Sequence, residues 1–441
     1  STDAYNLLGS ESLTEGYAVS STDVAAKLVS VNTHYITREY SQEGTRRQSR
    51  ELESVAMLPV TDAVTTASYY VETSDDSDVL FSFINDTNAA AAIEFSLTTE
   101  DGQQFEDSRT ILASNQLALN VSELFSGNAV QGSLSISSSQ PVHIQGLFEV
   151  GNGEGETLLA PAPGVQGSPE YSEVMAERRI LPAIPTGAGS YVKVVLLNAS
   201  DNVMSGTIEV TDQDDVSYEI APGQSIVHNI PPDARPPLEG KGIIRAEVGP
   251  APEAFALVAA LTRSGAMSSL HTVTSHQEGP LFWAPLDTYP DVLHNGNIDT
   301  RLYLVNDKNI PATVYLEWFD IDGNSVDIFE RTIVRGESAI LNIEEIYGQN
   351  PVRGTLRVFS DTGINATLQE STRTVLGETV VLDIPLQVTP DASASRKVFP
   401  LFRNGGGYAT EMLSINTDRS NHGGSLSVVS SDGDAIEIIL R

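Results

Sequence analysis

Short stretches dominated by apolar residues, or alternating between apolar and polar ones, recur along the chain, and each has the length of one β-strand. A first set ends in asparagine: Val79–Asn85, Tyr191–Asn198, Arg301–Asn306 and Glu411–Asn416. The asparagine positions 85, 198, 306 and 416 differ by 113, 108 and 110 residues. A constant period of this length indicates tandem domains of one fold.

The remaining turns and strands of each unit recur at the same spacing from its asparagine. Ala312–Phe319, for example, leads into Asp322-Gly323, and Asp-Gly between apolar runs is a strong hairpin signal because glycine accepts the positive φ of such turns. The second half of each complete unit opens at Gly132, Gly242 or Gly354, with side chains alternating between two faces. That period of two is typical of a half-buried strand.

Each complete unit therefore holds about seven strands in roughly 110 residues, the size of an immunoglobulin-like sandwich. We predict an all-β fold, in which tandem immunoglobulin-like β-sandwich domains form an elongated array with half-domains at both ends. The predicted domains are a C-terminal half at residues 1–65, whole sandwiches at 66–165, 177–276 and 280–388, and an N-terminal half at 396–441.

Half a sandwich would leave an apolar face and unpaired strand edges in water. Two interpretations are open for the terminal halves. In the first, the chain is a segment of a longer repeat protein, and neighbouring repeats complete the halves. In the second, the C-terminal half of one subunit completes the N-terminal half of the next and gives a head-to-tail homopolymer. Both interpretations predict an elongated molecule.

The charge and composition narrow the possible partners. The chain has 25 basic and 59 acidic residues, a formal charge of −34, so we expect no nucleic-acid partner, because phosphate binding needs clustered Lys and Arg. No apolar run approaches the roughly 20 residues of a membrane-spanning helix, so we expect no membrane insertion. The absence of cysteine removes disulfides and thiolate sites. Acidic, cysteine-free β-proteins of this kind are common among exported proteins, so we expect an extracellular or cell-surface location, although the cytoplasm stays open.

One stretch resembles a known repeat. Phe399-Pro400-Leu401-Phe402 leads through Gly405-Gly406-Gly407 and Tyr408 into Leu413-Ser414-Ile415-Asn416. This is similar to the F-P-x-F opening, Gly-rich turn, aromatic residue and L-x-L-x-N strand of a tandem β-sandwich repeat in exported bacterial surface and extracellular proteins. The resemblance implies a stalk, adhesion or accessory module. It implies no catalytic residues.

An oxygen-rich turn is the candidate metal site. Asp320, Asp322 and Asn324 place oxygen atoms at alternate positions of a tight turn, which suits Ca²⁺, although the downstream Glu of an EF-hand is missing. The alternative is a plain acidic hairpin. We expect no other cofactor. His271 and His276 are five residues apart, which fits neither the helical nor the strand spacing of metal ligands, so the histidines are interpreted as structural or surface residues.

Two further patterns bear on interactions. Arg46, Arg47 and Arg50 form one basic island, interpreted either as a solvated loop or, in a polymer, as an interface with acidic loops of a neighbour. Four N-x-S/T sequons permit N-glycosylation, at Asn85, Asn120, Asn198 and Asn365.

No motif indicates an enzyme, since a G-x-S-x-G nucleophile elbow is absent and no other catalytic pattern stands out. We predict a structural subunit or segment of an extracellular filament, sheath or surface stalk, possessing no catalytic activity. The alternative is an adhesin or accessory glycan-binding module of a larger secreted protein. Exposed aromatic residues clustered on one sandwich face, such as Trp283 or Trp318, would support that alternative.

Overall fold

The structure is a computed structural model of the 441-residue chain. It describes residues 2–3, 14–22, 26–42, 45–125, 129–153, 156–166, 178–262, 264–275, 278–287, 298–348, 352–373, 379–384, 386–388, 396–404, 408–416, 424–430 and 435–440.

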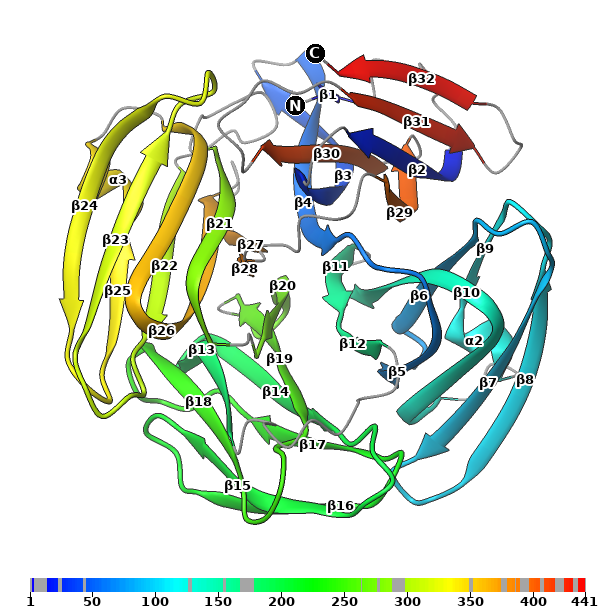
Figure 1. The fold of residues 1–441 in the computed structure, drawn as a ribbon, viewed down its shortest axis with the longest axis horizontal. Helices are drawn as coiled ribbons and strands as arrows, with labels where there is room; N and C mark the ends of the chain where they lie inside the picture. Colours follow the sequence, from blue (N-terminus) through cyan, green and yellow to red (C-terminus); the bar gives the residue numbers. More distant parts are fainter. Residues whose placement is uncertain are drawn as a thin grey trace.

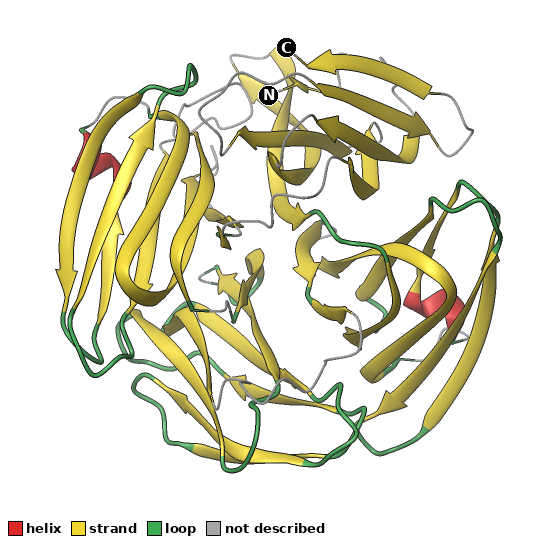
Figure 2. Ribbon diagram, in the orientation of Figure 1, coloured by secondary structure: helices red, strands yellow, loops and turns green. Residues whose placement is uncertain are grey.

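Antiparallel strands make up most of the described chain (Figure 2). The helices among these residues are the single turns α2 (Val121–Leu124) and α3 (Ile343–Tyr347). The predicted all-β fold is confirmed. Within the same residues, no helix combines the length and hydrophobicity needed to cross a membrane.

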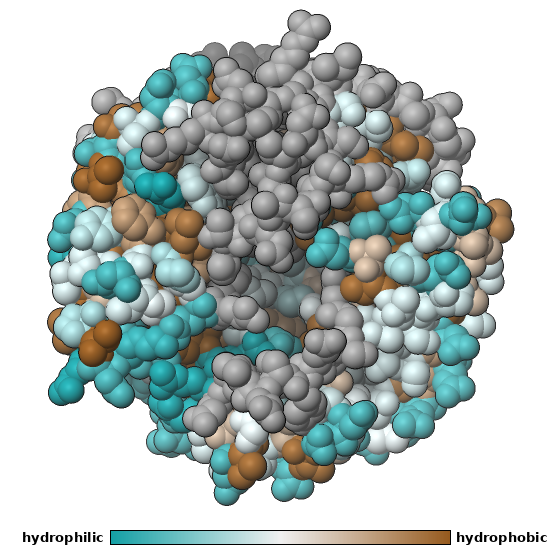
Figure 3. All heavy atoms as spheres, viewed as in Figure 1, coloured by the Kyte–Doolittle hydropathy of each residue, from teal (hydrophilic) through white to brown (hydrophobic). Residues whose placement is uncertain are grey.

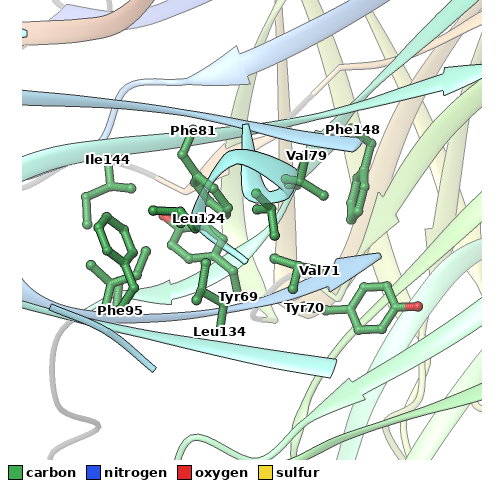
Figure 4. Close-up of a cluster of buried hydrophobic side chains, with 14 of the residues drawn as sticks. Tyr69, Tyr70, Val71, Val79, Phe81, Phe95, Leu124, Leu134, Ile144 and Phe148 are labelled. Atoms are coloured by element: carbon green, nitrogen blue, oxygen red, sulfur yellow. The ribbon is translucent and has the colours of Figure 1, made fainter. Parts of the chain in front are cut away.

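The first sandwich has two sheets that share one long strand, β10. Its first half pairs with β5 and β7 and its second half with β6 and β11. Between the sheets lies an aromatic core (Figure 4), in which the rings of Tyr69 and Phe81 meet edge to face at 4.8 Å. The strands are β5 (Val64–Glu72), β6 (Ser77–Asn85), β7 (Ala91–Thr99), β8 (Gln104–Ile111), β9 (Asn115–Asn120), β10 (Gln131–Gly151), β11 (Thr157–Ala162) and β12 (Gly164–Gln166).

The second sandwich has two separate sheets, in the orders β13-β18-β15-β16 and β17-β14-β19-β20. Aliphatic side chains such as Val194, Ile208 and Ile244 fill the space between them. The strands are β13 (Arg178–Thr186), β14 (Ser190–Leu197), β15 (Met204–Val210), β16 (Val216–Ile220), β17 (Ser225–Ile230), β18 (Leu238–Ala246), β19 (Glu253–Leu261) and β20 (Met267–Thr274).

The third sandwich repeats the shared-strand arrangement of the first. The long strand β26 pairs with β21 and β23 in one sheet and with β22 and β27 in the other. The strands are β21 (Gly279–Asp287), β22 (Ile298–Val305), β23 (Ala312–Phe319), β24 (Ser325–Ile333), β25 (Ser338–Asn342), β26 (Arg353–Arg373), β27 (Thr379–Ile384) and β28 (Gln387–Val388).

The fourth sandwich is built from both ends of the chain. Its sheets have the orders β29-β2-β31-β32 and β1-β30-β3-β4. The first, N-terminal set of strands is β1 (Thr2–Asp3), β2 (Thr14–Thr22), β3 (Ala26–Gln42) and β4 (Thr45–Pro59). The second, C-terminal set is β29 (Arg396–Asn404), β30 (Tyr408–Asn416), β31 (Gly424–Ser430) and β32 (Ala435–Leu440).

The four sandwiches form a ring, and both termini lie in the fourth (Figure 1). Strands β4, β11, β20 and β27 meet at the centre, each in contact with the next around the ring. The predicted elongated array is wrong. Neighbouring sandwiches contact each other: the ring centroids of Tyr70 on β5 and Phe255 on β19 are 6.2 Å apart, and Lys193 forms an ion pair with Glu72 at 2.7 Å.

Ring closure changes the interpretation of the terminal halves. Their strands pair with each other, β2 with β29 and β31, and β3 with β30. Both interpretations of the sequence sought the missing half outside the chain. Because three whole sandwiches turn around a common centre, the two ends of the chain arrive side by side and complete one sandwich within a single molecule.

Two of the three glycine landmarks, Gly132 and Gly354, have a steric cause. A Cβ atom at Gly132 would overlap the carbonyl oxygen of Thr98, and one at Gly354 would overlap that of Phe319. Gly354 also has a φ of 143°, a conformation that L-residues avoid. Glycine therefore allows the long strand to approach its neighbour where the second half of the unit begins.

Candidate functional site

Three of the asparagines that mark the repeat, Asn85, Asn198 and Asn306, tie loops together inside the sandwiches; the side chain of the fourth, Asn416, lies outside the described part of the structure. The Asn85 side chain is fully buried, and its Nδ2 donates to the carbonyls of Ala89, Ile111 and Leu112 at 2.7, 3.2 and 3.1 Å. Its Oδ1 accepts from the backbone N–H and the hydroxyl of Thr87. One side chain thus ties two loops together.

The same clamp recurs in the next two sandwiches. Asn198 donates to Asn202, Ile220 and Ala221 and accepts from Ser200. Asn306 donates to Ile310, Ile333 and Val334 and accepts from the Lys308 N–H.

This clamp accounts for two predicted glycosylation sites. The hydroxyl that completes the sequon at Asn85 or Asn198 serves to orient the asparagine, and a glycan on the buried Nδ2 would break the clamp. Glycosylation of these two residues would therefore compete with the clamp, and it stays a prediction. Asn120 precedes α2 without a side-chain cap bond, and Asn365 is 4% exposed on β26; glycosylation there stays a prediction.

The predicted metal turn lies between β23 and β24. One carboxylate oxygen of Asp320 accepts from the backbone N–H groups of Asp322 and Asn324 at 3.0 and 2.8 Å. These bonds, foremost those from Asn324, lower the pKa of Asp320. Among the described residues no three His, Asp or Glu side chains gather as a metal site. The hydrogen bonds account for the turn as an acidic hairpin, and Ca²⁺ binding there stays a prediction.

Arg46, Arg47 and Arg50 lie on β4, opposite Ser41, Tyr40 and Thr37 of β3. The interpretation of this segment as a loop is wrong. The arginine side chains lie outside the described part of the structure, as does His276, so an interface role of the arginines stays a prediction.

An arginine surrounded by aromatic rings covers the outer face of the third sandwich. Arg357 of β26 lies 5.6 Å from the Trp283 ring, 5.5 Å from Phe319 and 5.0 Å from Phe359. It forms an ion pair with Glu317, which is only 4% exposed. The cluster joins β21, β23 and β26.

The two tryptophans do not form an open aromatic platform. Trp283 is 8% exposed beneath this cluster. Trp318 packs against Tyr347 at the edge of the core, and its Nε1 donates to the Arg353 carbonyl at 3.3 Å. Neither provides the exposed stacking surface expected of a glycan-binding face.

A concave region with polar and titratable side chains in its wall lies between the second and third sandwiches. A cavity of about 490 Å³ opens there, with His271 and Glu239 on one side and Arg301, Tyr303 and Gln369 on the other. A second cavity of about 530 Å³ adjoins Asp383 towards the centre of the ring, where the space-filling view is hollowed (Figure 3). Volumes of this size suit small molecules.

A buried pair separates the two cavities. His271 of β20 and Asp383 of β27 are 6% exposed and about one-tenth exposed, with Nε2 3.9 Å from Oδ2. Gln369 lies opposite Asp383 in the sheet. His271 Nδ1 lacks a hydrogen-bond partner among the described residues. Buried polar atoms normally have one.

Burial sets the protonation of this pair. It lowers the pKa of His271 to about 4 and raises the pKa of Asp383 to about 8, the latter opposed by a hydrogen bond from Gln369. At pH 7 both groups are therefore predominantly neutral. Desolvation is the dominant cause because a charge in this position would lose its hydration.

Sequence reasoning missed this pair. Asp383 is 112 positions from His271 (383 − 271), and only the ring brings β20 to β27. The available signal was the carboxylate itself, because Asp383 interrupts the apolar run Val380–Ile384. Charged residues inside such a run are rarely buried without a reason.

A comparison with protein-family models and with curated protein sequences found no match. What defines the class of this molecule is therefore its own architecture, a ring of β-sandwiches closed by its terminal strands.

Proposed function

We propose that this protein is a structural module of an exported surface protein, in which the closed ring serves as a rigid scaffold without catalytic activity. The observation that carries the proposal is the pairing of β2 with β29 and β31, which locks the first strands of the chain to the last. A closed ring resists extension because no sandwich can leave without breaking two junctions.

The junctions support this role. At the boundary of the fourth and first sandwiches, the Ser82 hydroxyl donates to the Pro400 carbonyl at 2.5 Å, and the Leu401 N–H donates to Gln145 at 3.1 Å. Arg178 and Asp307 form an ion pair at 2.6 Å between the second and third. The formal charge of −34 keeps such a module soluble at an extracellular surface.

The proposal also has a filament version, in which the same terminal strands pair between two copies of the chain. Strand pairs that close the ring within one chain can form between two chains, as in domain swapping. A head-to-tail filament then replaces the ring.

A disulfide test separates the ring from the filament. Val19 and Ser427 lie directly opposite each other on β2 and β31, and the chain contains no cysteine. In the double variant V19C/S427C, a ring gives an oxidised monomer with an internal disulfide, since paired strands bring the Cα atoms within bonding range. V19C and S427C alone serve as controls. A series of disulfide-linked oligomers that forms only when both cysteines are present would establish the filament and contradict the ring.

A second candidate function is ligand binding, as an adhesin or accessory glycan-binding module. The observation that favours it is the polar cavity between the second and third sandwiches.

A further inference from the structure

We propose that strand β24 of the third sandwich is an interface, at which two copies of this chain pair edge to edge around a two-fold axis. The contact goes beyond the scaffold role, since it uses a strand edge that ring closure leaves open. Its occupant is a second copy of the chain, paired antiparallel with Phe329 on the axis.

The first step is the open edge of β24. This strand ends its sheet, which has the order β24-β23-β26-β21-β28, and it lies on the outer rim of the ring (Figure 1). Its nine residues, Ser325–Ile333, run along β23, and no described strand pairs with its other side. An unpaired edge of this length is a template for a further strand.

The second step is the apolar character of this edge. Val326 and Ile328 of β24 are 49% and 54% exposed. Six of the ten exposed large apolar side chains in the described part of the chain belong to the third sandwich, namely Ile310, Ile321, Val326, Ile328, Val334 and Ile340. Apolar side chains gathered at an open edge favour pairing with another strand.

The corresponding edge strands of the first two sandwiches are polar. Exposed positions of β8 carry Glu106 and Ser108. Those of β16 carry Ser217 and Glu219. Both strands end their sheets on the rim, as β24 does (Figure 1). Because polar and charged side chains are what normally keeps an edge strand single, the apolar residues of β24 distinguish the third sandwich as the one that makes a contact.

The third step is charge complementarity, which selects both the occupant and the register. With Phe329 opposite its own copy, Asp327 of each chain lies opposite Arg331 of the other. Opposite charges across a strand pair stabilise it, and like charges destabilise it. A register centred on Glu330 would bring two carboxylates together, and one centred on Ile328 would leave Asp327 without an opposite charge.

The two charged side chains are suited to this contact in the single chain. Both are exposed. One carboxylate oxygen of Asp327 accepts from the Ile328 N–H at 2.8 Å, which holds the carboxylate at the strand and leaves its second oxygen for a guanidinium. Arg331 has no ion-pair partner among the residues that the structure describes.

The fourth step is the size of the contact. Nine residues of a strand span about 30 Å, and the edge of two packed sheets is about 15 Å deep. Pairing along β24 therefore buries on the order of 1,000 Å² in total, which is the lower end for a specific interface. We expect a reversible dimer with a Kd of about 10–100 µM.

The test measures the mass of the full chain by sedimentation equilibrium, from about 1 µM to about 0.5 mM. Salt at about 0.15 M screens the charge of −34 on each copy beyond about 8 Å. We expect the mass to double over this range. Ile328→Lys should stay monomeric, because a charge at the paired edge opposes strand addition. Ser108→Lys on β8 is the matched control and should dimerise as the wild type does.

Charge reversal tests the register. Asp327→Arg and Arg331→Asp each place like charges opposite each other in a homodimer, so each should raise the Kd at least about tenfold. An equal mixture of the two variants restores both opposite-charge pairs between unlike chains and should form a heterodimer. The double variant Asp327→Arg/Arg331→Asp should dimerise again. Recovery in the mixture also shows that each single variant is folded.

Three outcomes overturn the proposal while the internal disulfide of V19C/S427C still reports a closed ring. They are a wild type that stays monomeric at about 0.5 mM, well above the expected Kd, an Ile328→Lys variant that dimerises as well as the wild type, and a mixture of charge variants that stays monomeric. Oligomers that V19C/S427C links between chains would also overturn it, since the terminal strands would then form the contact. Only this last outcome contradicts the ring as well.

Discussion

Single asparagine side chains hold the loops of three sandwiches together. The free energy of unfolding that is lost when one of these side chains is removed can be measured. Asn85→Ala deletes three donated hydrogen bonds and leaves buried carbonyls without that partner. We expect a loss of about 2–4 kcal/mol in the free energy of unfolding, measured by urea denaturation. Asn120→Ala is the matched control, since its side chain makes no cap hydrogen bond, and should change stability by less than about 0.5 kcal/mol. Equal losses in the two variants would contradict the clamp.

The buried pair predicts an unusual dependence of stability on pH. The folded-state pKa of Asp383 is about 8, above its unfolded value, so between these values the native state holds a proton that the unfolded chain has lost. Stability conferred by that proton falls as pH rises, by at most about 1.4 kcal/mol per pH unit. For His271 the folded pKa is about 4, so stability rises with pH between 4 and 6.5 and offsets the first trend there.

The two effects together predict that stability falls between pH 6.5 and 8. Denaturation of Asp383→Asn should show no such fall, because an amide mimics the neutral carboxyl at every pH. The control is Asp320→Asn at the exposed hairpin, which should still show the fall in stability. An unchanged fall in Asp383→Asn would exclude Asp383 as its source.

At the scale of strands, local patterns of apolar and polar residues carried most of the information about where the strands lie. Ala312–Phe319 is one strand, as its apolar pattern predicts. By contrast, the alternating pattern that opens at Gly354 does not indicate where its strand ends, and the structure continues that strand as β26, from Arg353 to Arg373. Alternation alone cannot distinguish a turn from a bend, because continuity depends on whether neighbouring strands of both sheets pair along the whole length.

The arginine cluster predicts how one face is held together. Arg357→Met leaves Glu317, only 4% exposed, without its partner, and we expect a loss of about 3 kcal/mol. The pair Arg245 and Glu209 occupies the corresponding place in the second sandwich, with side chains 42% and 31% exposed. Arg245→Met should therefore cost about 1 kcal/mol or less. Denaturation of both variants measures the difference.

A second substitution checks the cause. In Arg357→Met/Glu317→Leu no carboxylate is left buried, so stability should recover most of the loss. If the double variant is as unstable as Arg357→Met, packing of the guanidinium on Trp283 and Phe359, and not the ion pair, dominates.

At the scale of the whole molecule, the orientation of one sandwich relative to the next could not be predicted from the sequence. The repeat period indicates the size of each unit, but the turn from one unit to the next depends on contacts such as Tyr70 with Phe255 that link separate sandwiches. The pair of His271 and Asp383 has the same origin. Ring closure and the candidate site are therefore two results of one packing geometry.

That geometry makes the overall dimensions a direct test. A compact chain of 441 residues has a radius of gyration of about 22 Å, and the ring should scatter X-rays with a value slightly above this because its centre is hollowed. Four sandwiches in a line would give roughly 40 Å, since a domain of about 100 residues is some 34 Å across. A value near 40 Å at low concentration would mean that the terminal strands do not close the ring. In Ile328→Lys, in which pairing through β24 is blocked, a value near 22 Å that grows with protein concentration would instead show that the same strands exchange between copies, because exchange is bimolecular and closure is not.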